Sequence, residues 1–341
     1  MADHRTHAPD AGRLVVLIPL FNDWEAADLL LDGLDSAFAQ SAAPVDVLIL
    51  DDGSTDAPPD HFGQRRFAAL QSVDILRLRR NLGHQRAIAV GLVYVYENRP
   101  CQAVIVMDSD GEDRPEDIPR LLERFHQDGA NSIVFAARSK RLERFPFRIL
   151  YHLYRVIHRL LTGDPVRVGN FSVVPFECLA KLVVVPEIWN HYAAAVIRSR
   201  IQFSSIPIPR GRRVAGRSKM NFTGLLLHGL SAFFVYGDIV GARLLVAIAL
   251  ALILETVLVA VGIGVRVSAS PNVVSIAAYL AGLLGIILLQ AIPIALILVF
   301  SVIGSRANVG FLPLRDCPYF VNSVQRIFPE SYKTVCEDFS S

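Results

Sequence analysis

The sequence predicts an α/β protein: a Rossmann-like, mostly parallel sheet flanked by helices, followed by interfacial helices and a two-helix transmembrane hairpin. Two observations lead to this fold class. Short apolar runs alternate with helical segments over residues 13–137, an order typical of right-handed βαβ units. Beyond residue 243, two long apolar stretches contain only one charged side chain, Glu255.

Five mostly apolar segments that end at turn residues or polar clusters are expected to be strands, at residues 13–20, 45–50, 73–78, 103–107 and 132–137. Helical periodicity predicts helices over residues 22–39, 84–97 and 115–127. In parallel sheets, ligands gather beyond the carboxyl ends of the strands. The polar residues that follow these runs are therefore the first candidates for a site.

Two basic stretches follow the predicted sheet. Residues 146–161 predict a helix with one basic face, which suits either a membrane surface or an anionic ligand, or is a solvated surface. Residues 198–219 hold seven Lys or Arg and no acidic side chain. Residues 222–242 are weakly amphipathic and are expected to lie along a membrane interface.

Each apolar stretch is long enough to cross about 30 Å of hydrocarbon, which needs about 20 residues. We expect spans at about 244–265 and 273–304, inside a hairpin region, 243–306. The chain then divides into a globular domain (1–221), the interfacial region (222–242), the hairpin and a C-terminal tail (307–341). Glu255 lies within the first span. It is expected to be a functional group, to contact a partner, or to be protonated and packed against another helix.

The charges around the hairpin predict its orientation. Lys and Arg flank its outer ends, whereas the connecting loop carries one positive charge, Arg266. This positive-inside pattern predicts a multi-pass protein of the inner (cytoplasmic) membrane, with the globular domain and both termini in the cytoplasm. The polar N-terminus has no signal-peptide segment, in agreement with that orientation. A net charge of +2 carries no signal for nucleic acid, and a homo-oligomer through the transmembrane helices is left open.

The triplet Asp108-Ser109-Asp110 follows the fourth apolar run. Two carboxylates at the end of a buried strand suit a hard divalent cation such as Mg²⁺ or Mn²⁺, which also binds substrate phosphates. Taken alone the triplet is weak evidence, because most such carboxylates are solvated loop residues. Two further clusters, residues 51–52 and 81–83, follow other predicted strands. Their convergence at one edge of the sheet favours the metal hypothesis.

Five ordered motifs between residues 15 and 219 resemble the family 2 glycosyltransferases with a GT-A fold. They are Val-Val-Leu-Ile-Pro-Leu-Phe-Asn-Asp at 15–23, Leu-Asp-Asp-Gly-Ser-Thr-Asp at 50–56, Asn-Leu-Gly-His-Gln-Arg-Ala at 81–87, Asp-Ser-Asp-Gly-Glu-Asp-Arg-Pro-Glu at 108–116 and Arg-Val-Ala-Gly-Arg-Ser-Lys at 213–219. With the two-helix region, the chain is similar to the membrane-bound polyprenyl-phosphate glycosyltransferases, such as the dolichyl-phosphate mannose synthases.

This resemblance implies an inverting transfer of one sugar from a UDP- or GDP-sugar to an undecaprenyl- or dolichyl-type polyprenyl phosphate, at the cytoplasmic membrane face. Residues 1–221 would be the GT-A catalytic domain, and the implied metal ligands for Mg²⁺ or Mn²⁺ are Asp108, Asp110 and Glu112. The implied nucleotide-sugar site comprises Pro19, Phe21, Asp23, Leu50, Asp52, Asp108, Arg213 and Lys219. The implied lipid-phosphate contacts are Arg138, Arg141, Arg148, Arg213 and Lys219. The implied catalytic residues are Asp110, Arg138 and Asn170.

One position departs from the family pattern. The family usually has an Asp, considered as a catalytic base, where this chain has Asn170. Asparagine accepts no proton at neutral pH, but a phosphate acceptor with a second pKa of about 6 is already largely ionised at pH 7. We therefore expect the acceptor to be a lipid phosphate and Asn170 to be an orienting group. Asp164 is a less favoured candidate for the missing carboxylate. Trp189 and His191 lie where sugar contacts are expected, although Trp189 suits core packing equally well.

Two other functions are less compatible with the sequence. A processive membrane polysaccharide synthase typically carries a Gln-x-x-Arg-Trp motif and more spans, and neither Trp24 nor Trp189 follows an Arg here. A non-catalytic membrane scaffold that retains the fold is disfavoured because the carboxylates at all three strand ends are intact.

Overall fold

The computed structural model describes residues 12–138, 156, 159–163, 168–209, 211, 213–215, 231, 235–265, 271–307 and 310–329. The chain divides into two compact units. The first comprises Met1–Arg144, Val166–Val235 and Phe311–Ser341, and the second comprises Phe145–Pro165 and Tyr236–Gly310.

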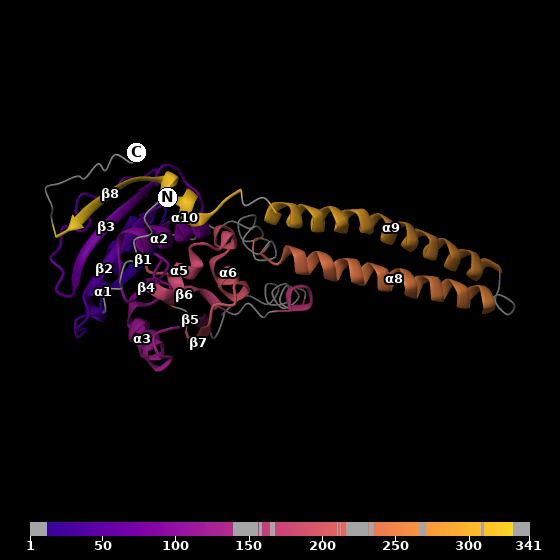
Figure 1. The fold of residues 1–341 in the computed structure, drawn as a ribbon, viewed down its shortest axis with the longest axis horizontal. Helices are drawn as coiled ribbons and strands as arrows, with labels where there is room; N and C mark the ends of the chain where they lie inside the picture. The colour runs from indigo at the N-terminus through magenta and orange to yellow at the C-terminus, as the bar shows by residue number, and fades with distance from the viewer. Residues whose placement is uncertain are drawn as a thin grey trace. The chain divides into compact units, whose positions relative to one another are not determined.

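The first unit is built on an eight-stranded sheet with the order β7-β5-β6-β4-β1-β2-β3-β8 (Figure 1). The strands are β1 (Leu14–Leu20), β2 (Val45–Asp51), β3 (Leu70–Leu78), β4 (Ala103–Val106), β5 (Ile133–Arg138), β6 (Val168–Pro175), β7 (Phe203–Ile208) and β8 (Val321–Phe328). Strands β4, β1, β2 and β3 are parallel, whereas β6 and β8 are antiparallel to their neighbours. The predicted fold class, a mostly parallel sheet flanked by helices, is confirmed.

Apolar side chains on both faces of the central strands hold the sheet between two layers of helices. In β1, Val15 and Leu17 join one core cluster, and Val16 and Ile18 join the other. Successive side chains of a strand point to opposite faces, so both faces are buried. One cluster includes residues of α2 (His84–Asn98), α5 (Phe176–Leu182) and α6 (Tyr192–Arg198). The other includes residues of α1 (Trp24–Ala37) and α3 (Ile118–Gln127), which follows the short helix η1 (Pro115–Asp117).

The five predicted strands are present as β1 to β5, and three further strands were not predicted. Strand β6 has Gly169 and Asn170 directly after its first residue, and both are poor strand formers. Strand β7 contains Pro207, which is tolerated because β7 is an edge strand. Strand β8 comes from residues 307–341, which the sequence assigns to a tail outside the domain. In the structure β8 pairs with β3, and Arg326 bonds to buried Asp74 at 3.0 Å.

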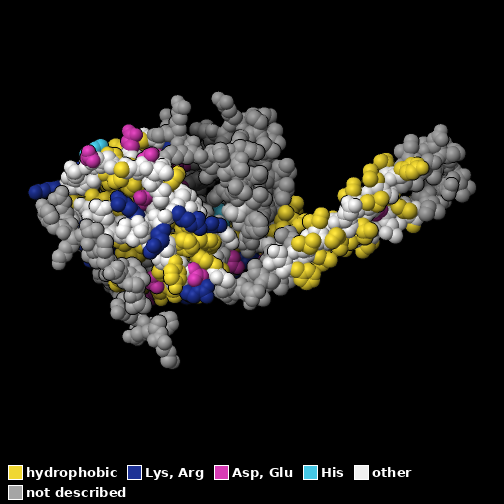
Figure 2. All heavy atoms as spheres, turned by 90° about the horizontal axis from the view of Figure 1, so that it is seen from above, with side chains coloured by type: hydrophobic (Ala, Val, Ile, Leu, Met, Phe, Trp, Pro, Cys, Tyr) yellow, Lys and Arg dark blue, Asp and Glu magenta, His cyan; other side chains and the backbone are white. Residues whose placement is uncertain are grey.

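The second unit contains two helices that are long and apolar enough to cross a membrane. The helices α8 (Gly237–Val265) and α9 (Pro271–Ala307) contain candidate spans at Gly237–Val261 and Tyr279–Ser301. Figure 2 shows hydrophobic side chains along their described part. A Cβ on Gly285 would lie 3.1 Å from Oε1 of Glu255. Because glycine has no side chain, Gly285 leaves room for the Glu255 carboxyl group beside α9. Most of the two predicted amphipathic helices, 146–161 and 222–242, lies outside the described residues.

Candidate functional site

The carboxyl ends of β1, β2 and β4 bring acidic residues from three motifs to one edge of the sheet. Asp23 follows β1, Asp52 follows β2 and Asp108 follows β4. Strand β1 lies between the other two, and its ends are joined to them by backbone hydrogen bonds. Asp52 N–H donates to the carbonyl of Leu20 at 2.8 Å, and Met107 N–H donates to that of Leu17 at 3.1 Å.

Asp52 organises the turn at residues 81–83. Its two carboxylate oxygens accept the backbone N–H groups of Leu82 at 2.7 Å and Gly83 at 2.9 Å. Burial raises the pKa of Asp52, and these two hydrogen bonds partly oppose the rise. Gly53 has φ +69°, and a Cβ there would lie 2.6 Å from the backbone nitrogen of Asn81. The close approach of the two turns therefore requires glycine.

The turn at residues 108–113 places several carboxylates close together. Asp108 N–H donates to Asp113 Oδ2 at 3.0 Å, and Glu112 N–H donates to Asp110 Oδ1 at 2.9 Å. Burial raises the pKa of Asp110, and the negative charges of Asp108 and Glu112 raise it further. The turn thus concentrates negative charge that a cation would stabilise.

A segment that we call the strap, Gly211 with residues 213–215, packs on this turn. Gly211 N–H donates to the carbonyl of Glu112 at 2.9 Å, and Val214 N–H donates to that of Asp110 at 3.1 Å. A Cβ on Gly111 would lie 2.2 Å from Val214 Cγ2. Since Gly111 also has φ +79°, only glycine fits beneath the strap.

The strap delivers Arg213 to the carboxylates at the ends of two strands. Its guanidinium forms ion pairs with Asp23 and, at 3.3 Å, with Asp110 Oδ2. Its Nε–H donates to the carbonyl of Ala215 at 3.0 Å. Three motifs that are separated by up to 190 positions in the chain meet at this one side chain.

Asn170, in β6, faces the same turn. Its Nδ2 lies 3.5 Å from Asp108 Oδ1 and 2.9 Å from His84 Nε2. Its Oδ1 accepts a hydrogen bond from Gln85 Nε2 at 3.2 Å. The orienting role expected for Asn170 is compatible with these contacts, since its amide joins α2 to the end of β4.

His84 was not among the predicted site residues, yet its Nε2 lies 3.1 Å from Asp108 Oδ1. Burial by itself would lower the pKa of His84, but the charge and hydrogen bond of Asp108, with the charges of Asp113 and Asp110, raise it overall. The only sequence signal was its position directly after Gly83, at the start of α2.

Some of the other predicted site residues lie in the described part of the structure, and the rest do not. Pro19 and Leu50 belong to the strands β1 and β2, and Phe21 is 38% exposed beyond the end of β1. Arg138 ends β5, but its side chain is not described, and Arg141, Arg148, Asp164 and Lys219 lie outside the described residues.

Trp189, in the short helix η2 (Pro186–Trp189), packs against aromatic rings of the C-terminal segment. Its ring centroid lies 4.2 Å from that of Phe311 and 5.2 Å from that of Phe320. The guanidinium carbon of Arg86 lies 5.3 Å from its centroid. These contacts favour the packing alternative for Trp189. Phe311 precedes the short helix α10 (Pro313–Asp316), and Phe320 ends the short helix η3 (Cys317–Phe320), which leads into β8.

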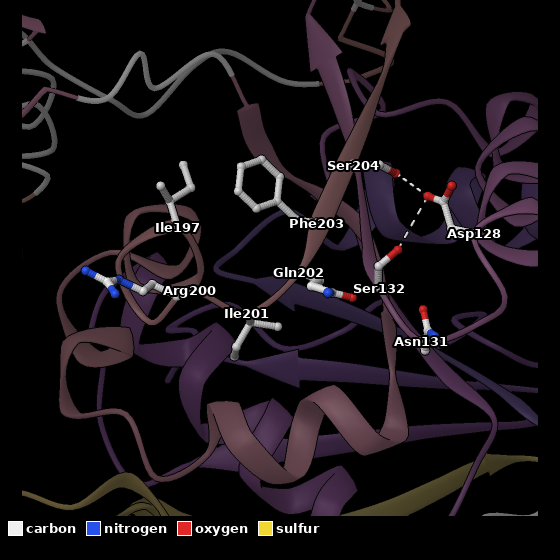
Figure 3. Close-up of a pocket in the computed structure, with 9 residues that line it drawn as sticks. All are labelled: Asp128, Asn131, Ser132, Ile197, Arg200, Ile201, Gln202, Phe203 and Ser204. Carbon is white, nitrogen blue, oxygen red and sulfur yellow. Dashed lines mark hydrogen bonds between the residues drawn. The ribbon is translucent and has the colours of Figure 1, made fainter.

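A shallow hollow of about 560 Å³ lies elsewhere, at the amino ends of β5 and β7 (Figure 3). Asp128 there bonds to Ser204 at 2.5 Å and to Ser132 at 3.4 Å. The hollow contains none of the motif residues, and the carboxylate cluster lies at the opposite ends of the strands.

The residues at the turn fit a divalent cation in their chemistry. Mg²⁺ commonly binds through one or two carboxylates together with substrate phosphates and water. Asp108 and Asp110 supply two such groups. Burial and, to a lesser extent, the neighbouring negative charges raise the pKa of Asp110, and a cation would relieve the repulsion between these charges. Within the described ranges, no group of three or more His, Cys, Asp or Glu side chains could hold a metal ion. Glu112 as a third ligand therefore stays a prediction.

Comparison with known proteins gives one family and several relatives. Residues 15–182 match the family model described as Glycosyl transferase family 2. The undecaprenyl-phosphate 4-deoxy-4-formamido-L-arabinose transferase of Klebsiella pneumoniae (strain 342) is 26% identical over 230 residues, which are 64% of this chain and 65% of that protein. The uncharacterized glycosyltransferase YkcC of Bacillus subtilis (strain 168) is 24% identical over 226 residues, 64% of this chain and 67% of that protein. This chain thus matches less than two thirds of the length of the first of these relatives.

Solved structures of glycosyltransferases are similar to this chain at lower sequence identity. Glucosyl-3-phosphoglycerate synthase from Mycobacterium tuberculosis, in complex with Mn²⁺, UDP-glucose and phosphoglyceric acid, aligns with a TM-score of 0.49 and 16% identity, over 68% of this chain and 81% of that chain. The mannosyltransferase PcManGT from Pyrobaculum calidifontis, in complex with GDP-Man and Mn²⁺, aligns with a TM-score of 0.42 and 17% identity, over 90% and 79%.

Proposed function

Since residues 15–182 of this chain match the model of glycosyl transferase family 2, we propose that the protein transfers one sugar from a nucleotide-sugar to a polyprenyl phosphate. The observation that carries the proposal is the bridge that Arg213 makes between Asp23 and Asp110. It gathers a carboxylate suited to a nucleoside, a carboxylate suited to a cation and a guanidinium suited to phosphate at one strand edge.

The acceptor phosphate supplies its own nucleophile. With a second pKa of about 6 it is largely dianionic at pH 7, so no protein base has to remove a proton. One of its oxygens attacks the anomeric carbon, the bond from that carbon to the donor diphosphate breaks, and the nucleoside diphosphate leaves with inversion. Asn170, which accepts no proton, is compatible with this chemistry.

The other site residues would bind the nucleoside, the cation and the phosphates. Asp23 and Asp52, with Pro19, Phe21 and Leu50, would line the nucleoside site, although Asp52 also holds the turn at 81–83. Asp108 and Asp110, with Glu112, would hold Mg²⁺ or Mn²⁺, which neutralises the donor diphosphate when bound. Cationic side chains would grip the donor and lipid phosphates: Arg138, Arg141, Arg148, Arg213 and Lys219.

The helices α8 and α9 support a membrane location for this reaction. Both contain candidate spans, and a polyprenyl phosphate presents its headgroup at the membrane surface. We propose that the helices form a hairpin in the inner membrane, with the catalytic unit and both termini on the cytoplasmic side. The donor is then a UDP- or GDP-sugar from the cytoplasm.

The test incubates membranes that contain the full-length protein with a panel of UDP- and GDP-sugars and with undecaprenyl or dolichyl phosphate. Mass spectrometry is expected to find one hexose-sized unit on the lipid phosphate. Asp110→Asn is expected to abolish the product without unfolding the protein, whereas Asp60→Asn, an exposed turn residue, leaves it unchanged. A polymer would instead identify a processive synthase. Full turnover by Asp110→Asn, or no reaction with any donor, would contradict the proposal.

A further inference from the structure

A chain of hydrogen bonds determines which way the Asn170 amide faces. Amide oxygen and nitrogen positions are normally assigned from the network around them. Here the network begins at Tyr192 N–H, which can only donate. The Gln85 atom 2.7 Å away must therefore be its carbonyl oxygen, Oε1. Gln85 then presents its Nε2–H₂ to Asn170 at 3.2 Å, so the Asn170 atom at that contact must be Oδ1.

The other end of the Asn170 amide is a donor as a consequence. Its Nδ2 donates to Asp108 Oδ1 at 3.5 Å and lies 2.9 Å from His84 Nε2, whose role as donor or acceptor depends on the histidine tautomer. If the amide were reversed, its carbonyl oxygen would face the Asp108 carboxylate and repel it. Hydrogen bonds to charged groups are worth more than neutral ones, so this orientation matters most at Asp108.

The surroundings hold this chain in place. Gln85 is buried, with 9% of its surface exposed. Ser172 Oγ donates to the carbonyl of Asn170 at 2.8 Å and lies 2.8 Å from the Tyr192 hydroxyl. Tyr192 is fully buried at the start of α6. Ser172 thus joins the backbone of Asn170 to the side chain of Tyr192, the two residues that Gln85 contacts.

We propose that Gln85 is a positioning residue that acts through Asn170 on Asp108. It directs the Asn170 N–H₂ at Asp108 Oδ1 and so orients the Asp108 carboxylate toward the donor diphosphate and its cation. The inference rests on the proposed function, because Asp108 is assigned there to the cation. It assigns Gln85 a role in the reaction, and it explains how an asparagine is useful where the family usually has a carboxylate.

The alternative is that Gln85 only caps the Tyr192 N–H and stabilises α6. A double-mutant cycle separates the two. Gln85→Met keeps the side-chain length, adds no charge and removes both of its hydrogen bonds. It is made in the wild-type background and in Asn170→Ala, and the affinity of each full-length protein in detergent for Mn²⁺ alone is measured from the spectrum of free Mn²⁺. Gln127→Met, an exposed residue of α3, is the matched control.

If Gln85 acts through Asn170, Gln85→Met weakens Mn²⁺ binding about tenfold in the wild-type background and causes no further loss in Asn170→Ala. An equal loss in both backgrounds, or a lower midpoint of thermal unfolding with unchanged Mn²⁺ affinity, would overturn the inference and leave the proposed function standing. Failure of the wild-type protein to bind Mn²⁺ at all, together with absence of sugar transfer, would overturn both.

Discussion

Arg213→Gln is expected to tighten the binding of Mn²⁺ alone to the full-length protein, while it weakens the binding of a nucleoside diphosphate. The guanidinium of Arg213 pairs with Asp23 and with Asp110 Oδ2 at 3.3 Å. A cation that binds Asp110 has to break this ion pair. Glutamine removes the competitor for the cation and also removes the charge that attracts phosphate, so the two affinities change in opposite directions.

The magnitude follows from the geometry of the pair. Two unit charges 3.3 Å apart attract by about 5 kcal/mol at an effective dielectric constant of about 20. The net value is much smaller, because Arg213 and Asp110 keep 21% and 20% of their side-chain surface exposed, and ordering and desolvation oppose the attraction. Ion pairs open to solvent are worth up to about 1 kcal/mol. The expected gain in Mn²⁺ affinity is therefore about fivefold.

The assay titrates Mn²⁺ into the detergent-solubilised protein without nucleotide, and then titrates UDP and GDP at saturating Mn²⁺. Arg124→Gln is the control, because Arg124 forms a comparable pair with Asp128 at 2.8 Å at the end of α3. It is expected to leave both affinities unchanged. If Arg213→Gln binds Mn²⁺ no more tightly than the wild-type protein, the competition does not exist and the reasoning is refuted.

Two further changes test the local structure. Gly111→Ala is expected to displace the strap at Val214 and lower transfer at least about tenfold. Gly129→Ala is its control, because Gly129 has a similar φ of +75° but its nearest neighbour is 3.7 Å from a Cβ, so it costs only the backbone strain of about 1–2 kcal/mol. Normal transfer by Gly111→Ala would contradict the packing of the strap. Asp128→Asn is expected to lower stability at pH 7 and to lower it less at pH 3. The serine and arginine hydrogen bonds lower the pKa of Asp128 below 3.8, so its stabilisation is present above that value and lost as the pH falls through the lowered pKa. Thermal unfolding measures this, and equal destabilisation at both pH values would exclude the effect.

The parallel core was predictable because its signals are local. Strands β1 and β4 are continuous apolar runs, and β2 is interrupted only by Asp46; each is followed by a polar cluster, so both its position and its carboxyl end can be read from the chain. The antiparallel strands lack this signal. Strand β6 contains Gly169 and Asn170 directly after its first residue. Strand β8 is half polar, and its partner β3 lies some 240 positions earlier in the chain.

The sequence by itself determined which side chains end the parallel strands, and hence that Asp52, Asp108 and Asp110 share one edge of the sheet. Local periodicity suffices for that, because the carboxyl ends of parallel strands meet at one edge. Only the tertiary structure decided that Arg213 bridges Asp23 and Asp110, and that Gln85 turns the donor end of Asn170 toward Asp108. These contacts join segments far apart in the chain. The direction of the Gln85–Asn170 contact depends on a single backbone N–H at Tyr192, which no motif spacing encodes.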